Sequence, residues 1–505
     1  MSVSFNNIPG NIRVPLFYAE MDNSAANTAQ ASGASLMIAQ ALPDSVIERD
    51  KVLIISSADQ VKKLAGRGSP LARMVARYRK IDPYGELYII APKDDATLKK
   101  AEGSIALAGK ATEAGAIYLY VGSDRVQVVV SVNDTPVEVG QAMADKINAN
   151  ADLPVTAVYA AATESQPAQV IVTAKWGGVT GNNIPLSLNY YGATSGEETP
   201  EGINVTITAM KGGVGDVVID GAVAAMGDNE FDYIGLPFSD ASALSIISAE
   251  MNDDTGRWSW SRQLYGHVYT VRYGSLSDLV AFGDSKNEQH ITVCGYEQAT
   301  QSPLDEVVAA RLARQAVYLR IDPARPTQTG EITGILPAPV GSRFSLTEFQ
   351  SLLTHGIATA SVTNGVLQIQ RDITTYKKNK FGVEDNSYLD SETLHTSAYV
   401  LRRLKSVITS KYPRHKLASD GTRFGAGQAI VTPAVLKGEI CSEYRQLELA
   451  GIVENFALFK QHLIVERNAN DPTRVDVLFP PDYVNQLRVF ALLNQFRLQY
   501  NEETA

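Results

Sequence analysis

Histidines and cysteines are the residues of this sequence that could bind a metal ion or act as nucleophiles. The histidines occur singly, with no pair at i,i+4 spacing and no cysteine beside them at the spacing of a zinc site. They are His267, His290, His355, His395, His415 and His462. This pattern predicts no metal site and no cofactor. Cys294 and Cys441 lie far apart in apolar surroundings, which predicts buried thiols and not a disulfide framework.

Two glycine-rich stretches loosely resemble nucleotide-binding loops. Residues 103–111 read GSIALAGKA, whose spacer is too long for a phosphate-binding loop and whose Ala111 replaces the hydroxyl that would hold magnesium. We expect there a helix whose apolar face carries Ile105, Leu107 and Ala108. Residues 421–427 read GTRFGAG, which lacks the G-x-G-x-x-G order of a dinucleotide fold and predicts a loop before a helix at Thr432.

No motif marks a catalytic nucleophile. The G-x-S-x-G turn of an α/β hydrolase is absent from the sequence. A catalytic triad is recognised by its geometry, so the order of residues alone does not decide the point. The sequence predicts a protein that is not an enzyme, and an α/β hydrolase or nucleotide binder with an inserted substrate domain stays as a distant alternative.

Composition narrows the class of protein. The chain has 505 residues, of which 45% are hydrophobic and 20% charged, and this length allows about three globular domains. The 45 basic and 55 acidic side chains give a net charge of −10, which disfavours direct contact with nucleic acid because that contact depends on clustered Lys and Arg. No apolar run is long enough to cross a bilayer and the first residues do not resemble a secretion signal, so we expect no membrane insertion and assembly in the cytosol.

Helices and strands that could position a functional site alternate in the first part of the chain, which is an α/β pattern. Residues 36–102 predict a buried strand at 52–55, helices that begin at Ser57 and Ser69, and a strand at 87–90. Alternation of strand and helix resumes at 233–319, as in a mostly parallel layered sheet. Residues 103–213 are β-rich, with a single helix at 137–148, and we interpret them as an inserted domain.

The last third of the chain carries helix and hairpin signals. Ser345 and Glu348 form a capping box, Asn364-Gly365 predicts a hairpin turn, and Thr432 begins a helix that runs through Glu448. Two basic helices, at 71–80 and 399–405, have two possible interpretations: amphipathic helices with solvated charges, or helices that face acidic patches on an adjacent subunit.

These patterns together predict an α/β and α+β multidomain fold. Its parts are an N-terminal arm at 1–26, a layered and mostly parallel α/β domain at 27–102 and 214–344, an inserted β-rich domain at 103–213, a C-terminal α+β domain at 345–483 that ends in an antiparallel sheet, and an extended C-terminal arm at 484–505.

The N-terminal arm contains one predicted strand. Ile12, Val14, Leu16 and Tyr18 alternate with other residues, and Pro15, which lacks an N–H donor, suits an edge strand. Residues 23–35 are small and polar, which is typical of a flexible tether. An isolated strand is not stable alone, so this one must dock on its own domain or on a neighbour, and the pattern leaves both open.

Three strands are predicted at the C-terminus, at 458–466, 475–479 and 484–498. The last is apolar on both faces, with Arg488 and Arg497 as its charged residues, so it needs cover on both sides. It is either a terminal strand of the chain's own sheet or a strand offered to a neighbouring subunit.

Residues 459–498, together with RFGAGQAIVTP at 423–433 and ELAGIVEN at 448–455, resemble the tail sheath proteins of Mu-like contractile-tailed phages and prophages. The resemblance is strongest over the last hundred residues or so. It implies a structural protein whose α/β domain has been described as subtilisin-like. It also implies a homo-oligomer of hexameric rings stacked helically around a tail tube protein, with baseplate and tail terminator proteins as further partners.

Such a sheath would belong to the virion tail, be assembled in the host cytoplasm, and contract to drive the tube through the cell envelope for genome ejection. The sheath of a phage-tail-like bacteriocin or secretion device is the alternative. In this family, strands of the terminal arms link subunits. The corresponding residues here are Ile12, Val14, Leu16, Tyr18, Leu487, Val489, Phe490, Ala491, Leu492, Leu493, Phe496 and Leu498.

Overall fold

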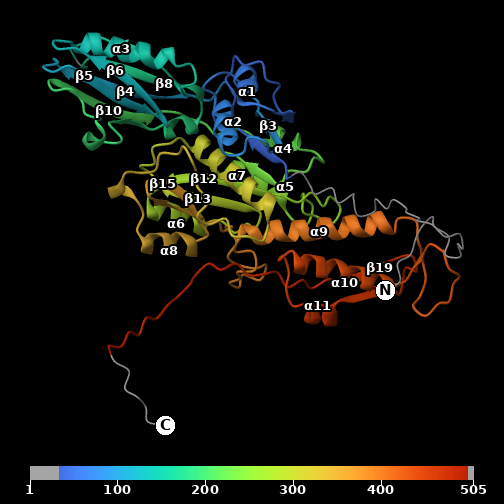
Figure 1. Ribbon diagram of the computed structural model, residues 1–505. Coiled ribbons are helices and arrows are strands. Elements are labelled where there is room, and N and C mark those ends of the chain that lie inside the picture. The colour runs from blue at the N-terminus through green and yellow to red at the C-terminus, as the bar shows by residue number, and fades with distance from the viewer. Residues whose placement is uncertain (1–32, 165, 499–505) are drawn as a thin grey trace, which may run out of the picture.

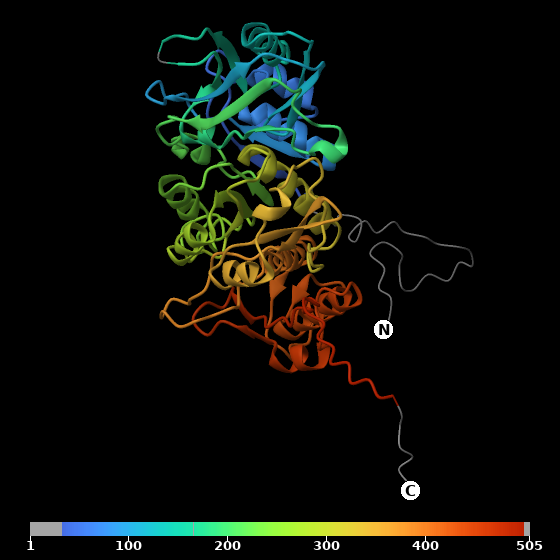
Figure 2. The same ribbon diagram turned by 90° about the vertical axis from the view of Figure 1, so that its left-hand side faces the viewer.

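The computed structural model describes residues 33–164 and 166–498. The chain is elongated, and its parts follow one another along the long axis in Figures 1 and 2. A β-rich part lies at one end, an α/β sheet lies in the middle, and a helical part with a small hairpin lies at the other end.

A six-stranded sheet forms the middle of the molecule. Its strand order is β13-β12-β11-β1-β3-β2, and all pairs are parallel except β2 with β3. The strands are β1 (Ser35–Ile38), β2 (Leu53–Ile54), β3 (Leu87–Ile90), β11 (Tyr233–Gly235), β12 (His267–Gly274) and β13 (Ile291–Glu297). The predicted layered, mostly parallel sheet is therefore present in the described chain.

Helices cover both faces of this sheet, since alternate strand residues enter two separate apolar clusters. One face packs against α1 (Ala58–Ala65), α2 (Pro70–Ile81) and α7 (Leu304–Ile321). The other packs against α4 (Asp220–Ala224), α5 (Ala241–Met251) and α6 (Leu276–Asp284).

Two predictions about this sheet were wrong, one on where the N-terminal tether ends and one on the burial of a strand. Ser35, placed in a polar tether by its neighbours in sequence, is fully buried as the first residue of β1, which lies in the interior of the sheet between β11 and β3. The strand predicted as buried at 52–55 is the short edge strand β2, where the Ile54 side chain is 61% exposed. Burial in each case is decided by position in the sheet, which local composition does not contain.

Residues 100–211 form two antiparallel sheets around their own apolar cluster. The strand orders are β10-β4-β8-β7 and β6-β5-β9. The elements are β4 (Lys100–Gly109), β5 (Gly115–Val121), β6 (Asp124–Val130), α3 (Pro136–Ala149), β7 (Val155–Ala160), β8 (Gln169–Gly177), η1 (Val179–Asn183), β9 (Leu186–Leu188), η2 (Ala193–Ser195) and β10 (Ile203–Lys211). The helix predicted at 103–111 is wrong: most of that stretch is strand β4, in which Ala101, Gly103, Ile105 and Leu107 alternate as buried residues.

The rest of the chain combines helices with three small two-stranded sheets. The elements are η3 (Val340–Ser342), α8 (Leu346–Thr354), β14 (Thr359–Thr363), β15 (Val366–Arg371), α9 (Ser391–Lys411), β16 (Lys416–Leu417), β17 (Ile430–Val431), α10 (Pro433–Leu449), α11 (Phe456–His462), β18 (Ile464–Arg467) and β19 (Val475–Leu478). The strand predicted at 458–466 is wrong in its first half, because α11 precedes β18 there.

Candidate subunit-linking site

The hairpin of β18 and β19 has two open edges. These strands pair antiparallel with each other, Val465 opposite Val477, and no other strand of the described chain pairs with either of them. The Asn468 N–H donates to the Arg474 carbonyl at 2.9 Å, which continues the same register beyond the strands. Because hydrogen-bonded and non-bonded pairs alternate, the Val465 and Val477 peptide groups point away from the hairpin, toward its two edges.

Two helices support one side of this hairpin. The Tyr444 ring of α10 stacks on the Phe459 ring of α11, and Phe479, which follows β19, packs edge-on against Phe459. The Lys437 ammonium of α10 donates to the Leu463 carbonyl at 2.7 Å, directly before β18. The hairpin is thus packed on α10 and α11, while Val477 of β19 stays 45% exposed.

After the hairpin, the chain first runs along the folded part of the subunit, which we call the body, and then leaves it. Val484 donates its N–H to the Ile452 carbonyl at 3.2 Å, and Tyr483 bridges to Val453. Next, the Gln486 side-chain amide donates to the Ala324 carbonyl at 3.0 Å, and the Gln328 amide donates to the Leu487 carbonyl at 3.3 Å. Residues 483–488 therefore lie along the body.

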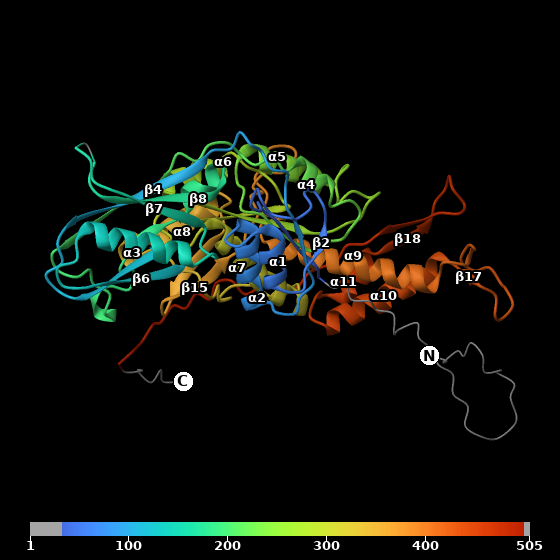
Figure 3. The same ribbon diagram turned by 90° about the horizontal axis from the view of Figure 1, so that it is seen from above.

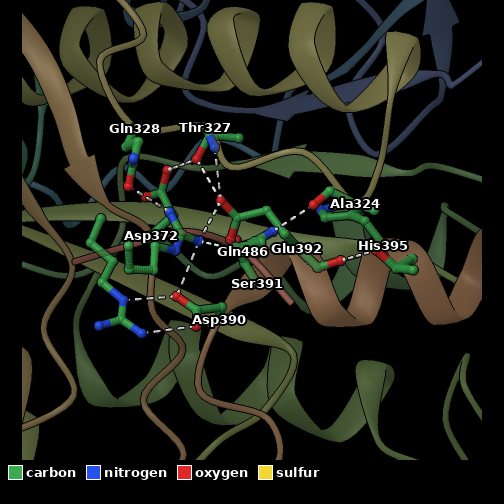
Figure 4. Close-up of polar contacts among 12 residues, drawn as sticks. Ala324, Thr327, Gln328, Asp372, Asp390, Ser391, Glu392, His395 and Gln486 are labelled. Atoms are coloured by element: carbon green, nitrogen blue, oxygen red, sulfur yellow. Dashed lines mark hydrogen bonds and ion pairs between the residues drawn. The ribbon is translucent and has the colours of Figure 1, made fainter. Parts of the chain in front are cut away.

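Arg488 is the last of these docked residues. Its Nη2 lies 3.2 Å from Asp390 and 3.0 Å from Glu392, at the start of α9, and its guanidinium also contacts Gln328 and Gln486. Figure 4 labels these four partners. The Glu392 side chain is fully buried. Burial raises the pKa of Glu392, and the positive charge of Arg488 opposes that rise.

Glu392 belongs to a larger buried polar cluster. The Thr327 N–H and hydroxyl both donate to Glu392, at 3.0 and 2.8 Å. The same hydroxyl reaches Asp372 at 3.4 Å, and Asp372 accepts a 2.9 Å bond from Nε of the buried Arg311. Asp390 in turn receives two 2.9 Å bonds from Arg371 of β15 (Figure 4). The cluster thus joins β15, the start of α9 and the C-terminal segment.

The chain beyond Arg488 is exposed at every described residue through 498. The Phe490 side chain, for example, is 80% exposed. This segment forms no strand with any described part of its own chain, so its interpretation as a terminal strand of a sheet in that part is wrong. Figures 1 and 3 show it leaving on the side of the molecule away from the β18–β19 hairpin.

The twelve residues predicted to link subunits divide into two groups. Eight lie in the exposed C-terminal segment, and the structure does not bring them to the hairpin of the same chain: Leu487, Val489, Phe490, Ala491, Leu492, Leu493, Phe496 and Leu498. The other four lie outside the described residues: Ile12, Val14, Leu16 and Tyr18.

The residues that hold the arm were not found from the sequence. Gln328, Asp390 and Glu392 are far from Arg488 along the chain, and no local pattern relates them. The one available signal is Arg488 itself, a charged residue inside an apolar run. A charge in such a run calls for a partner, but sequence does not say which.

Both interpretations of the basic helices were incomplete. Arg73 and Arg77 of α2 bind Glu306 of α7, so they are neither solvated nor free for a neighbour. In α9, Arg402 and Arg403 likewise pair with Asp232 and Glu443 of the same chain. These charges join elements within one subunit.

The histidines and cysteines form no metal site in the described ranges, where no group of three or more His, Cys, Asp or Glu side chains could hold an ion. His267 and His395 meet in the core, where the His395 Nε2 lies 2.9 Å from the Tyr269 hydroxyl. Cys294 is a buried free thiol, as predicted, and Cys441 is free but only partly buried. Among the described helices, none combines the length and apolar character of a membrane span.

Comparison with known proteins identifies related sequences over the whole chain. Residues 212–375 match the phage tail sheath protein central domain, and residues 383–497 match the phage tail sheath C-terminal domain. The chain is 37% identical over 501 residues to the Mu-like prophage FluMu tail sheath protein of Haemophilus influenzae, with 99% of this chain and 100% of that protein covered.

Solved structures of sheath proteins are similar to this chain at low sequence identity. A sheath tail protein of Desulfitobacterium hafniense gives a TM-score of 0.50 at 13% identity, covering 94% of this chain and 97% of that one. The PVC sheath of an extracellular contractile injection system, solved in its contracted state, gives a TM-score of 0.46 at 10% identity over 97% of this chain and 98% of that one.

Proposed function

The chain belongs to the phage tail sheath family, and from this premise we propose that its copies polymerise helically around a tail tube and contract to drive that tube through a host cell envelope for genome ejection. The subunit acts as a mechanical element and not as a catalyst. Its partners are further copies of itself in stacked hexameric rings, the tube protein, and the baseplate and terminator proteins at the two ends of the tail. Its place is the virion tail, after assembly in the host cytoplasm.

One observation supports this proposal: within the described residues, an exposed apolar segment and a hairpin with two open edges occur in the same chain but do not pair with each other. The acceptor is the β18–β19 hairpin with its two open edges. The donor is the exposed apolar segment 489–498, which forms no strand pair with the described residues of its own chain. An unpaired strand edge beside apolar surface favours addition of a strand from another molecule, with main-chain hydrogen bonds supplying affinity.

The geometry favours a continuing assembly and not a closed dimer. Donor and acceptor lie on different sides of the subunit in Figures 1 and 3, so each copy can give its arm to one neighbour and receive an arm from another. Contacts of this heterologous kind build rings where the rotation closes and helical filaments where it does not. The two hairpin edges also leave room for a second donated strand, and the predicted strand at Ile12, Val14, Leu16 and Tyr18 would supply it.

Contraction would then be a rigid-body rearrangement of subunits that stay linked. A strand joint at the end of an arm tolerates rotation of the body to which the arm belongs, because the joint and the body are separate packed units. The driving force would come from relaxation of a less stable packing, so no nucleotide is needed. This account requires that the arm link survives while other subunit contacts change.

The direct test is a chain that ends at Arg488, so that the anchor stays and only the donor segment is lost. We expect no tubes by negative-stain microscopy and sedimentation, with a monomer that melts like the full chain, because residues 489–498 make no strand pairs with residues 33–164 or 166–488 of their own subunit.

The matched control removes only residues 501–505, the polar sequence NEETA, and should still form tubes. Normal tubes from the chain that ends at Arg488 would show that the C-terminal segment does not link subunits.

A further inference from the structure

We propose that Arg488 is the positioning residue of the C-terminal arm: its guanidinium fixes where the arm leaves the body and in which direction, so that the part that reaches a neighbour begins at Val489. This inference rests on the proposed function, because the arm is taken to be the part that links subunits. It assigns Arg488, Glu392 and Gln328 a role that apolar strand pairing alone does not require.

The environment of the chain changes at Arg488. Gln486 and Arg488 are two residues apart in an extended segment, so their side chains point to the same side. Both point to the body: Gln486 donates to the Ala324 carbonyl (Figure 4), and the Arg488 guanidinium lies against the Asp390 and Glu392 carboxylates. The arginine side chain is 10% exposed, whereas all described residues beyond it are exposed.

Several independent contacts hold this one residue. Its guanidinium reaches two carboxylates and the Gln328 and Gln486 side-chain oxygens, and Gln328 also binds the neighbouring Leu487 carbonyl. A planar group with several donors fixes both position and orientation, which a lysine ammonium does not. Apart from Gln486, which belongs to the C-terminal segment itself, the bonded partners lie at the start of α9 and on the segment that follows α7, so these contacts fix the arm to the body.

Charge neutralisation also favours the docked arm. Glu392 has no exposed surface, and its carboxylate is neutralised by Arg488, with Thr327 donating to the same oxygen. Release of the arm would leave that carboxylate buried without a cation, which is unfavourable. The docked state is therefore the stable one, and the anchor resists being pulled out when a load acts on the arm.

For assembly, the anchor has two consequences: the linking segment is shorter, and it starts from a fixed point in a fixed direction. Residues 489–498 can span at most about 33 Å at roughly 3.3 Å per residue in an extended strand. An arm that begins at a fixed point explores a smaller volume than one that begins at 484, so its effective concentration at a neighbour's hairpin is higher. Leu487 would not pair with a neighbour, because its carbonyl is already bound to Gln328.

The test measures the position of the arm in the full-length, unassembled chain. Spin labels are placed on Phe490→Cys in the arm and Lys405→Cys on α9, with Cys441→Ser removing the partly exposed native thiol. Pulsed electron–electron double resonance then gives the distribution of distances between the two labels. The parent should give a narrow distribution, and Arg488→Gln should broaden it about twofold, as for a chain released into solvent.

Two further variants separate positioning from stability. Arg488→Gln combined with Glu392→Gln removes the unpaired buried charge, so it should melt close to the parent and still give the broad distribution. Asn485→Ala changes an exposed side chain in the same segment and should match the parent in both measurements.

The tube yield of the Arg488→Gln, Glu392→Gln pair completes the test, with an expected fall of about tenfold through lost effective concentration. A narrow distribution in that double variant would overturn the proposal, and so would a broad distribution with a normal yield of tubes. The first result does not depend on whether the chain that ends at Arg488 assembles. The second result counts against the positioning role when that truncated chain fails to assemble, and against the proposed function when the truncated chain forms normal tubes, so the two failures are distinguishable.

Discussion

The Tyr444 and Phe459 rings lie parallel, with their centroids 3.6 Å apart and their planes 9° from each other. The Tyr444 hydroxyl donates to the Glu454 carbonyl at 2.6 Å and accepts from the Asp482 N–H at 3.1 Å. One side chain thus connects α10, α11 and the chain on both sides of the hairpin. These contacts of Tyr444 lie within one subunit, so they hold the β18–β19 hairpin, and with it the two open edges, in place on α10 and α11.

We predict that Tyr444→Phe lowers the free energy of unfolding of this part by about 1–3 kcal/mol, because a buried carbonyl and an N–H lose their partner while the ring stacking remains. Hydrogen exchange of the amides at 464–478 should speed up accordingly. Tyr84→Phe, which changes a fully solvent-facing ring, is the control. Unchanged exchange in Tyr444→Phe would mean that the hydroxyl does not hold the hairpin.

We predict that proline at the hairpin edges blocks assembly without unfolding the subunit. Val477→Pro and Val465→Pro each remove an N–H that points away from the β18–β19 pairing, a place where edge strands tolerate proline. Both monomers should melt within a few degrees of the parent, yet form few or no tubes in a sedimentation assay. Val477→Thr changes the side chain and keeps the N–H, so it should assemble. Normal tubes from both proline variants would exclude strand addition at these edges.

We predict that residues 100–213 can be replaced by a short Gly/Ser linker with the six-stranded sheet intact. The Lys99 N–H donates to the Val214 carbonyl at 3.0 Å and the Val214 N–H to the Lys99 carbonyl at 3.3 Å, so the two ends of this part already meet. Termini that lie side by side at an exposed junction tolerate such replacement.

That replacement removes two ion pairs of Asp152, to Lys62 and Arg67, each worth roughly 0–1 kcal/mol at a partly exposed site. Circular dichroism and thermal melting check that the remaining chain folds, and microscopy checks whether it forms tubes. An unfolded product would show that this part is needed for the fold of the sheet.

We predict that the subunit loses stability as the pH falls below about 6.5. Burial lowers the pKa of His395 to about 3, with a further lowering by Arg402, so the folded chain keeps this ring neutral while the unfolded chain binds a proton near pH 6.5. The stability contributed by the neutral ring is complete above the unfolded pKa and is lost progressively as the pH falls toward the folded pKa. For this one residue the loss at pH 5 is about 2 kcal/mol.

The measurement is urea denaturation at pH 7 and pH 5. His395→Gln should show a smaller loss between the two pH values than the parent, whereas His415→Gln, at an exposed position, should match the parent. Burial also lowers the pKa of His267, so part of the loss should remain in His395→Gln. An equal loss in parent and His395→Gln would contradict the prediction.

Features whose physical cause lies within a few residues could be predicted from the sequence alone. Ser345 and Glu348 form the expected capping box, with the Ser345 N–H bound to the Glu348 carboxylate at 2.7 Å. Asn364 and Gly365 take the positive φ angles of 51° and 80° that a tight hairpin turn needs. The apolar arm was also evident, because the presence of large apolar residues on both of its faces is a property of the segment itself.

The tertiary structure decided everything that depends on which distant segments meet. Residues 35–38 and 100–109 are strands because neighbouring strands supply their hydrogen bonds and cover, while their own short apolar patterns fit a tether or a helix equally well. Whether 484–498 joins its own sheet depended on where Arg488 docks, and Asp390, Glu392 and Gln328 come from parts of the chain that only the fold places together. The sequence contained a largely apolar segment with Arg488 near its start and Arg497 near its end. The carboxylates that Arg488 pairs with, which only the fold brings to it, determine where the arm begins.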